Sequence, residues 1–247
     1  MTNDAMLAET VTITGYDGDD IEAYAARCLD EAPRGGMVVI HHMPGYDAAT
    51  KEITRKFAAN GYNAICPNLY WREAPGAAPD DAAAKVRAEG GVPDERLVGD
   101  VGGAMEYLKN LSNSNGKVAV IGYCSGGRQS WLANGSLPLD AAIVCYGAFI
   151  IGDVPEGMPP RPSLGHLAPT MSGPVLGLFG NDDMYPTPEA VDELERLLKG
   201  AGKPYEFHRY DDAGHAFFSV DRPSYRPAAA VDGWEKIWAF LATNLGS

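Results

Sequence analysis

One cysteine of this chain stands where a nucleophile is expected. The run Gly-Tyr-Cys-Ser-Gly-Gly at 122–127 directly follows the apolar segment 118–121, so Cys124 falls on a turn between a strand and a helix. Glycines suit such a turn, because a tight bend leaves no room for side chains beside the nucleophile. A thiolate is intrinsically nucleophilic once a base or a helix N-terminus favours its negative charge. The pattern predicts nucleophilic catalysis by Cys124; the alternative is a glycine-rich turn with a buried structural cysteine.

A base and an orienting acid follow in the expected order along the chain. His215 comes after Gly214 in a loop ahead of the last helix, which fits the order nucleophile, acid, histidine. The acid is expected directly after the apolar segment 174–179, where two aspartates stand. We favour Asp183 and keep Asp182 as the alternative; the other aspartate is expected to cap a turn or a helix start.

Backbone amides are expected to stabilise the negative charge of the tetrahedral intermediate. One is the amide of Ser125, and the other is that of Met43 in the loop after the strand at 37–40. The neighbouring His41 and His42 also suggest a metal site, but adjacent strand residues point to opposite faces and cannot easily bind one ion. No cluster of Asp, Glu or Cys completes such a site, so we expect no metal and no cofactor.

Apolar runs and helical patterns alternate along the chain. Alternation around an Asp-Gly turn predicts an N-terminal β-hairpin at about 10–28, and a buried strand is expected at 37–40. Further strands are expected at 63–66, 117–121, 141–145, 174–179 and 205–210, and helices at 48–60, 93–110, 129–133, 188–201 and 228–243. Repeated strand–helix units predict an α/β fold whose mostly parallel sheet carries helices on both faces.

Two segments interrupt this alternation. Residues 70–91 are rich in Ala, Pro and Gly, and residues 151–173 are rich in proline. Long loops in compact domains often serve as lids or pocket loops, and both follow strand ends, where open α/β sheets bind ligands. Because no linker-like change in composition separates the elements, we expect residues 1–247 to form a single domain.

Charge and composition narrow the classes of partner. With a formal net charge of −13, the 247-residue chain lacks the excess of cations that nucleic-acid binding needs. No apolar stretch approaches the roughly 20 residues that span a bilayer, and no leader pattern precedes the first strand. The four cysteines are far apart, which favours free thiols in a reducing compartment. We therefore expect a cytoplasmic protein, a monomer or small homo-oligomer, that binds a small molecule.

Four segments of the chain resemble the dienelactone hydrolases. They are the cysteine turn at 122–127, the run Cys-Pro-Asn-Leu-Tyr-Trp-Arg-Glu-Ala-Pro-Gly at 66–76, the acid loop at 180–188 and the run Gly-His-Ala-Phe at 214–217. The resemblance runs from about residue 12 to the C-terminus. It implies an α/β-hydrolase fold, a Cys-His-Asp triad, and opening of the enol-lactone ring of dienelactone to maleylacetate through an acyl-cysteine intermediate.

The resemblance also implies roles around the substrate. Arg72 is expected to bind a substrate carboxylate, for which a guanidinium is well shaped, or else to be a surface arginine. Tyr146 is expected to line the pocket or to pack in the core. His42 stands where the family carries a glutamate that controls ionisation of the thiol, which places His42 beside the substrate. Ser219 stands where the family has a second arginine, and Arg222 or Arg226 is a possible replacement.

The predicted function is hydrolysis of a carboxylic ester or lactone, including anionic substrates. Two alternatives differ in class. One is a thioesterase or small-ester esterase that uses the same three residues. The other is a hydrolase-like protein without catalysis, which binds a ligand or senses oxidants through Cys124, since exposed thiols of low pKa oxidise readily.

Overall fold

The computed structural model describes residues 5–152, 154 and 161–246. It divides into two compact units, Met1–Val120 with Leu245–Ser247, and Ile121–Asn244. A single domain therefore stays a prediction. Of the predicted loop at 151–173, residues 153 and 155–160 lie outside the described residues.

Eight strands form one sheet in the order β1-β2-β4-β3-β5-β6-β7-β8. They are β1 (Met6–Thr14), β2 (Asp20–Cys28), β3 (Arg34–Ile40), β4 (Asn63–Pro67), β5 (Ser114–Tyr123), β6 (Ala141–Cys145), β7 (Val175–Gly180) and β8 (Tyr205–Tyr210). β1 and β2 pair antiparallel as the predicted hairpin, and β2 also pairs antiparallel with β4. β3 runs parallel to β4, and β6, β7 and β8 run parallel to one another. The predicted α/β class with a mostly parallel sheet is confirmed.

Six α-helices accompany these strands in the described residues. They are α1 (Ala48–Ala59), α2 (Pro79–Ala88), α3 (Asp94–Lys109), α4 (Ser125–Ser136), α5 (Pro188–Gly200) and α6 (Pro227–Leu245), with 3₁₀ turns η1 (Tyr16–Gly18) and η2 (Gly165–Thr170). Five of the helices were expected. α2 was not, because its segment reads as a loop of small residues; a proline at its first position favours a helix start.

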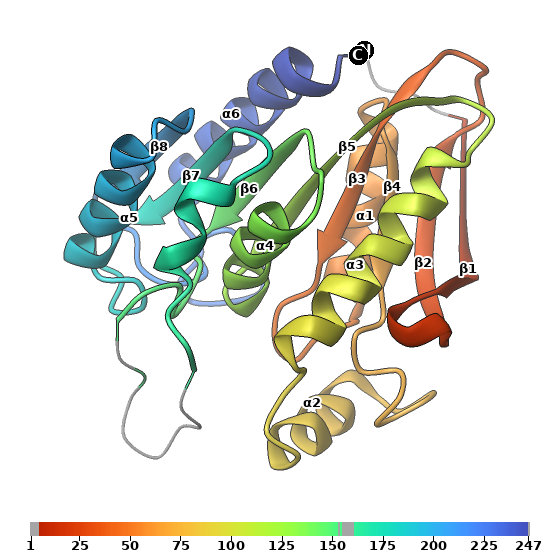
Figure 1. Cartoon of the computed structure of the whole chain (residues 1–247), viewed down its shortest axis with the longest axis horizontal. Helices are drawn as coiled ribbons and strands as arrows, with labels where there is room; N and C mark the ends of the chain where they lie inside the picture. The colour runs from red at the N-terminus through yellow and green to blue at the C-terminus, as the bar shows by residue number, and fades with distance from the viewer. Residues whose placement is uncertain (1–4, 153, 155–160, 247) are drawn as a thin grey trace. The chain divides into compact units, whose positions relative to one another are not determined.

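In the first unit, the hairpin turn η1 packs directly on α3. Two glycines of α3 make this approach possible: a Cβ at Gly103 would lie 2.0 Å from the carbonyl oxygen of Thr14, and one at Gly99 would lie 2.7 Å from Tyr16. Residues 37–40 of β3 form an apolar run that is fully buried. Figure 1 shows α3 in front of the strands of this unit and α1 behind them.

Candidate active site

Cys124 lies on the turn between β5 and α4, in a backbone conformation that is unusual for a side-chain-bearing residue. Its φ is 57° and its ψ is −119°, which costs on the order of 1–3 kcal/mol. Hydrogen bonds hold this conformation from both sides. The Cys124 amide donates to the Cys145 carbonyl at 3.1 Å, and the Cys124 carbonyl accepts from the amides of Gly127 at 3.0 Å and Ala148 at 3.2 Å. The side chain is therefore presented at the end of β5 by a fixed backbone.

The glycines around Cys124 allow close contacts between backbones. A Cβ at Gly122 would lie 2.1 Å from the carbonyl oxygen of Gly126, and one at Gly127 would lie 2.7 Å from the Cα of Gly147. Neither neighbour is a flexible side chain that could move aside. The turn therefore needs glycine at 122 and 127 for steric reasons.

Substituting Gly122→Ala is expected to distort the turn and to lower both activity and stability. The added methyl group must push the Gly126 carbonyl and with it the start of α4, a clash of the kind that costs about 1–3 kcal/mol or more. Ester hydrolysis and the midpoint of denaturant unfolding measure the two effects. Gly200→Ala is the matched control, because a Cβ at Gly200 meets nothing within 4 Å. Equal behaviour of the two variants would contradict the steric explanation.

His215 is held by Asp183. The Nδ1 atom of His215 lies 2.9 Å from Oδ2 of Asp183, whose side chain is almost completely buried. Asp182 is exposed, and its amide donates to the Ala213 carbonyl instead. Of the two aspartates considered from the sequence, Asp183 is thus the one that contacts the histidine. Gly180 permits this approach of the two loops, since a Cβ there would lie 2.1 Å from the Ala213 carbonyl oxygen.

The surroundings of His215 favour its charged form. Burial lowers its pKa, but hydrogen bonds with Asp183 and with Cys124, together with their negative charges, raise the pKa to about 10. The imidazole is thus predominantly protonated near pH 7 when the sulfur carries negative charge.

The raised pKa of His215 predicts a pH-dependent stability difference between wild type and Asp183→Asn. The folded protein holds this proton more tightly than the unfolded chain, so the resulting stabilisation is fully present below pH about 6.5 and is lost as the pH rises to about 10. Because the neutral amide of the variant would weaken this effect, the gap in free energy of unfolding should narrow between pH 6.5 and 10. Denaturant unfolding across this range measures it. Asp182→Asn serves as the control. If the difference in free energy of unfolding between wild type and variant were independent of pH for both variants, Asp183 would not be the residue that raises the pKa of His215.

Tyr146 lies beside His215 at the end of β6. Its buried ring meets the His215 ring edge-on, with centroids 5.2 Å apart. Burial raises the pKa of Tyr146 well above its usual range, while a hydrogen bond with Ser219 and the charge of Arg222 oppose that shift. Ser219 therefore contacts the phenol. Arg222 is near the same group, whereas Arg226 donates to backbone carbonyls, among them that of Asp212.

The loop at 41–47 in the first unit holds the other predicted residues. His41 is buried, and its Nε2 accepts a hydrogen bond from the Leu69 amide at 3.3 Å. Burial lowers the pKa of His41 to about 4, so this ring is neutral near pH 7. His42 faces Asp47, with Nε2 3.2 Å from Oδ2, and Met43 is half-buried between β3 and α1. The two histidines thus have separate partners.

Among residues 5–152, 154 and 161–246, no group of three or more His, Cys, Asp or Glu side chains is placed to hold a metal ion. None of the helices in the described ranges is long and apolar enough to cross a bilayer. The four cysteines, all within the described residues, form no disulfide, and Cys124 is the one that is not fully buried.

Comparison with known proteins decides the family. A model of the dienelactone hydrolase family matches residues 21–245. The chain is 31% identical over 245 residues to the carboxymethylenebutenolidase of Pseudomonas putida, which covers 96% of this chain and 97% of that protein. The chain belongs to the dienelactone hydrolase family. It is accordingly a hydrolase that acts on ester or lactone bonds.

Two further relatives support this membership in the dienelactone hydrolase family. A candidate carboxymethylenebutenolidase of Salmonella typhimurium is 32% identical over 249 residues, covering 98% of this chain and 89% of that protein. The crystal structure of a candidate dienelactone hydrolase from Klebsiella pneumoniae matches with a TM-score of 0.85 at 27% identity, covering 97% and 99% of the two chains. The predicted α/β-hydrolase fold is confirmed.

In this dienelactone hydrolase-family protein, Arg72 is held by two aspartates. Nη1 and Nη2 donate to Asp100 at 2.8 and 3.0 Å, and Nε donates to Asp19 at 2.7 Å. Nη2 also donates to the Tyr16 carbonyl at 3.3 Å. Arg72 thereby ties the hairpin turn to α3. Its role with a substrate carboxylate stays a prediction, since these four hydrogen bonds use four of the five N–H donors of the guanidinium.

Asp100 was not predicted from the sequence. A signal was present, because Asp100 lies on the same helical face as Leu97, Val101 and Ala104, which are all buried. An acidic residue inside an apolar helix face indicates a buried partner, since an unpaired charge there is costly. The sequence did not show that this partner is Arg72.

Proposed function

We propose that this protein cleaves esters and lactones through Cys124, His215 and Asp183. The Cys124 thiolate attacks the carbonyl carbon, the ring or ester C–O bond breaks, and His215 donates its proton to the leaving oxygen. Water then attacks the thioester on Cys124 while His215 takes up a proton from it. The C–S bond breaks, which releases the acid and restores the thiolate.

The arrangement around His215 carries this proposal. Asp183 occupies Nδ1 at 2.9 Å, which leaves Nε2 for the hydrogen bond with the Cys124 sulfur. Nucleophilic acyl transfer uses three side chains in a row: a nucleophile, a base that is hydrogen-bonded to the nucleophile, and an acid that is hydrogen-bonded to the base. The acid fixes the orientation of the ring and stabilises its positive charge.

Two backbone amides complete the proposal. Ser125 is the first residue of α4, where amides have no acceptor within the helix and the dipole favours negative charge. We assign the second amide to Met43, on the ground that the loop after the third strand supplies this donor in related enzymes of this fold. Both donors would act on the oxygen that becomes negative in the tetrahedral intermediate.

The proposed substrate is a lactone of the dienelactone type, which yields maleylacetate. Steady-state assays with dienelactone, p-nitrophenyl acetate and an acyl thioester test this choice. Turnover of dienelactone with the highest kcat/KM supports it. Preference for the thioester or for the simple ester would keep the mechanism and reject the lactone, and no turnover of any of the three would favour the non-catalytic alternative. A cytoplasmic location and a monomeric or small homo-oligomeric state remain predictions.

A further inference from the structure

Apolar residues are exposed around the candidate active site of the second unit. Met184 and Tyr185, which directly follow Asp183 in the acid loop, are 69% and 39% exposed. Val220, in the loop between β8 and α6 that also carries His215, is 74% exposed. These three residues are half of the six large apolar residues that are exposed in the described part of the chain. Exposed apolar residues that gather in one place indicate a surface that binds an apolar group.

Two aromatic rings meet at the acid loop. The centroids of the Phe149 and Tyr185 rings are 5.0 Å apart, and the two ring planes are inclined at 45°. The Tyr185 amide donates to Oδ1 of Asp183 at 2.8 Å, so the proposed acid also fixes the backbone of Tyr185. Phe149 follows Ala148, whose amide donates to the Cys124 carbonyl at 3.2 Å. The ring pair therefore joins the acid loop to the segment after β6 that supports the Cys124 turn.

Phe149 has a backbone conformation that a bulky residue seldom adopts. Its φ is 58°, in the left-handed region that favours glycine. Positive φ values also occur at Cys124, Tyr146 and Ala216, so four of the six such non-glycine residues among those described belong to the segments of the candidate site. Strain of this kind persists only where the surrounding structure holds it, and it is concentrated at active sites and ligand clamps. We therefore regard the position of the Phe149 ring against Tyr185 as a fixed feature of this surface.

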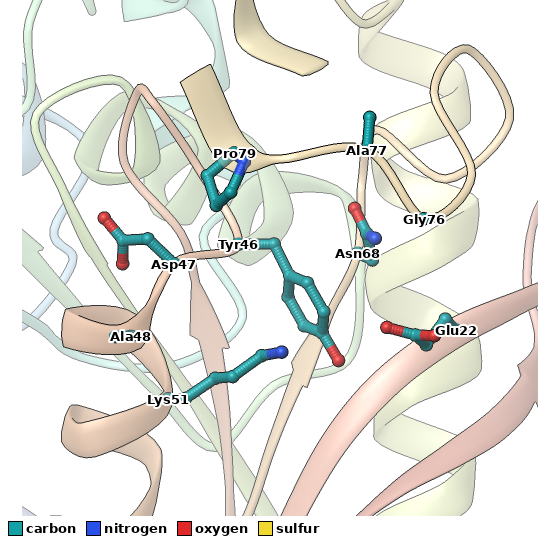
Figure 2. Close-up of a pocket in the computed structure, with 9 residues that line it drawn as sticks. All are labelled: Glu22, Tyr46, Asp47, Ala48, Lys51, Asn68, Gly76, Ala77 and Pro79. Carbon is teal, nitrogen blue, oxygen red and sulfur yellow. The ribbon is translucent and has the colours of Figure 1, made fainter. Parts of the chain in front are cut away.

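A cavity of about 360 Å³ in the first unit offers a different environment. Its lining combines an aromatic residue, Tyr46, with the charged side chains of Glu22, Asp47 and Lys51. Figure 2 shows the Tyr46 ring between Lys51 on one side and Glu22 on the other. Lys51 Nζ lies 4.1 Å from the centroid of this ring, so one face of the ring already holds an ammonium group. Burying an apolar group among these charges would desolvate them, which is costly, so we expect no aromatic ligand there.

We propose that the candidate site accepts esters or lactones that carry an aromatic group, and that this group packs against Phe149 and Tyr185. This rests on the proposed function, because it places the reacting carbonyl at Cys124. Aromatic rings gain from offset or edge-to-face contact with other rings, in addition to the apolar area that they bury. A cyclohexyl group of similar size gains only from the buried area. Dienelactone carries no aromatic group, so this surface extends the range of substrates beyond it.

Two matched pairs of esters test this proposal on the wild-type protein. Benzyl acetate and cyclohexylmethyl acetate differ in whether the alcohol part is aromatic, and p-nitrophenyl phenylacetate and p-nitrophenyl cyclohexylacetate differ in the same way in the acyl part. Each kcat/KM is divided by the rate constant for alkaline hydrolysis of the same ester, which removes differences in intrinsic reactivity. In at least one pair the aromatic ester is expected to exceed its cyclohexyl partner about threefold to tenfold. Equal or lower values for the aromatic ester in both pairs would overturn the proposal.

Variants locate the aromatic group. Tyr185→Leu and Phe149→Leu are each expected to lower the aromatic-to-cyclohexyl ratio about twofold or more, whereas Tyr185→Phe keeps the ring and should keep the ratio. Tyr46→Leu, in the cavity of the first unit, is the matched control and should also keep it. The proposal is overturned if neither leucine variant of the ring pair changes the ratio, or if Tyr46→Leu lowers it.

The ratio also separates this proposal from the mechanism. A partial loss of folded protein lowers the activity towards both members of a pair equally and leaves their ratio unchanged. Whether Cys124 becomes acylated by p-nitrophenyl acetate is measured independently. Acylation of Cys124 without any aromatic preference would overturn the proposed surface and leave the proposed function in place.

Discussion

Cys124→Ala is expected to lower kcat/KM for p-nitrophenyl acetate by about 10⁴-fold or more. The substitution removes the sulfur atom that the proposed mechanism uses to form the acyl intermediate. Since residues of such a unit act together, His215→Gln should cause a loss of similar size and the double variant little more. Steady-state kinetics of the three variants measure this lack of additivity.

Cys28→Ala is the matched control for the nucleophile. Cys28 is a fully buried thiol whose Sγ donates to the Ala58 carbonyl at 3.1 Å. Its replacement should leave kcat/KM unchanged within about a factor of two, with a modest loss of stability from the removed sulfur. Full activity of Cys124→Ala would contradict the assignment of the nucleophile, and loss of activity in Cys28→Ala would point to a general folding defect instead.

Asp100→Ala is expected to lower the free energy of unfolding by about 3–5 kcal/mol. Asp100 is completely buried, accepts two hydrogen bonds from Arg72, and accepts a third from the Tyr16 amide at 2.9 Å. Its removal leaves a largely buried guanidinium without its main counter-charge and frees the hairpin turn from α3. Urea unfolding followed by circular dichroism measures the loss.

Asp19→Ala separates the buried ion pair from the exposed one. Asp19 contacts the same guanidinium at 2.7 Å, but its side chain is 56% exposed. Exposed pairs contribute about 0–1 kcal/mol, so this variant should unfold nearly as the wild type does. If both aspartate variants lost the same stability, burial would not be the reason for the effect. Arg72→Ala kinetics on acidic substrates are informative only when the variant is shown to remain folded.

The elements of the fold were readable from the sequence where pattern and burial agree. The apolar run at 37–40 forms the fully buried part of β3, and the Asp-Gly turn joins the antiparallel pair β1 and β2. The helix α2 was not predicted from the sequence, because a segment rich in Ala, Pro and Gly has the composition of a loop. Within this helix Ala82, Ala83 and Val86 are buried, which the composition of the segment does not indicate.

The candidate site was predictable as far as chain order goes. The order of Cys124, Asp183 and His215 along strand–loop units indicated which side chains would meet, and Asp183 and His215 lie in contact. Partners that depend on tertiary packing were not readable. The sequence contains Arg72 and Asp100, 28 positions apart, without a sign that they pair.

Intact-mass spectrometry of the protein mixed with p-nitrophenyl acetate tests the central claim most directly. Attack by the Cys124 sulfur predicts a transient mass increase of one acetyl group, which peptide mapping places on Cys124 and which is absent from Cys124→Ala. His215→Gln should also fail to form it at a comparable rate. An acetyl group on another residue, or hydrolysis at the wild-type rate by Cys124→Ala, would contradict the mechanism proposed for this dienelactone hydrolase-family protein.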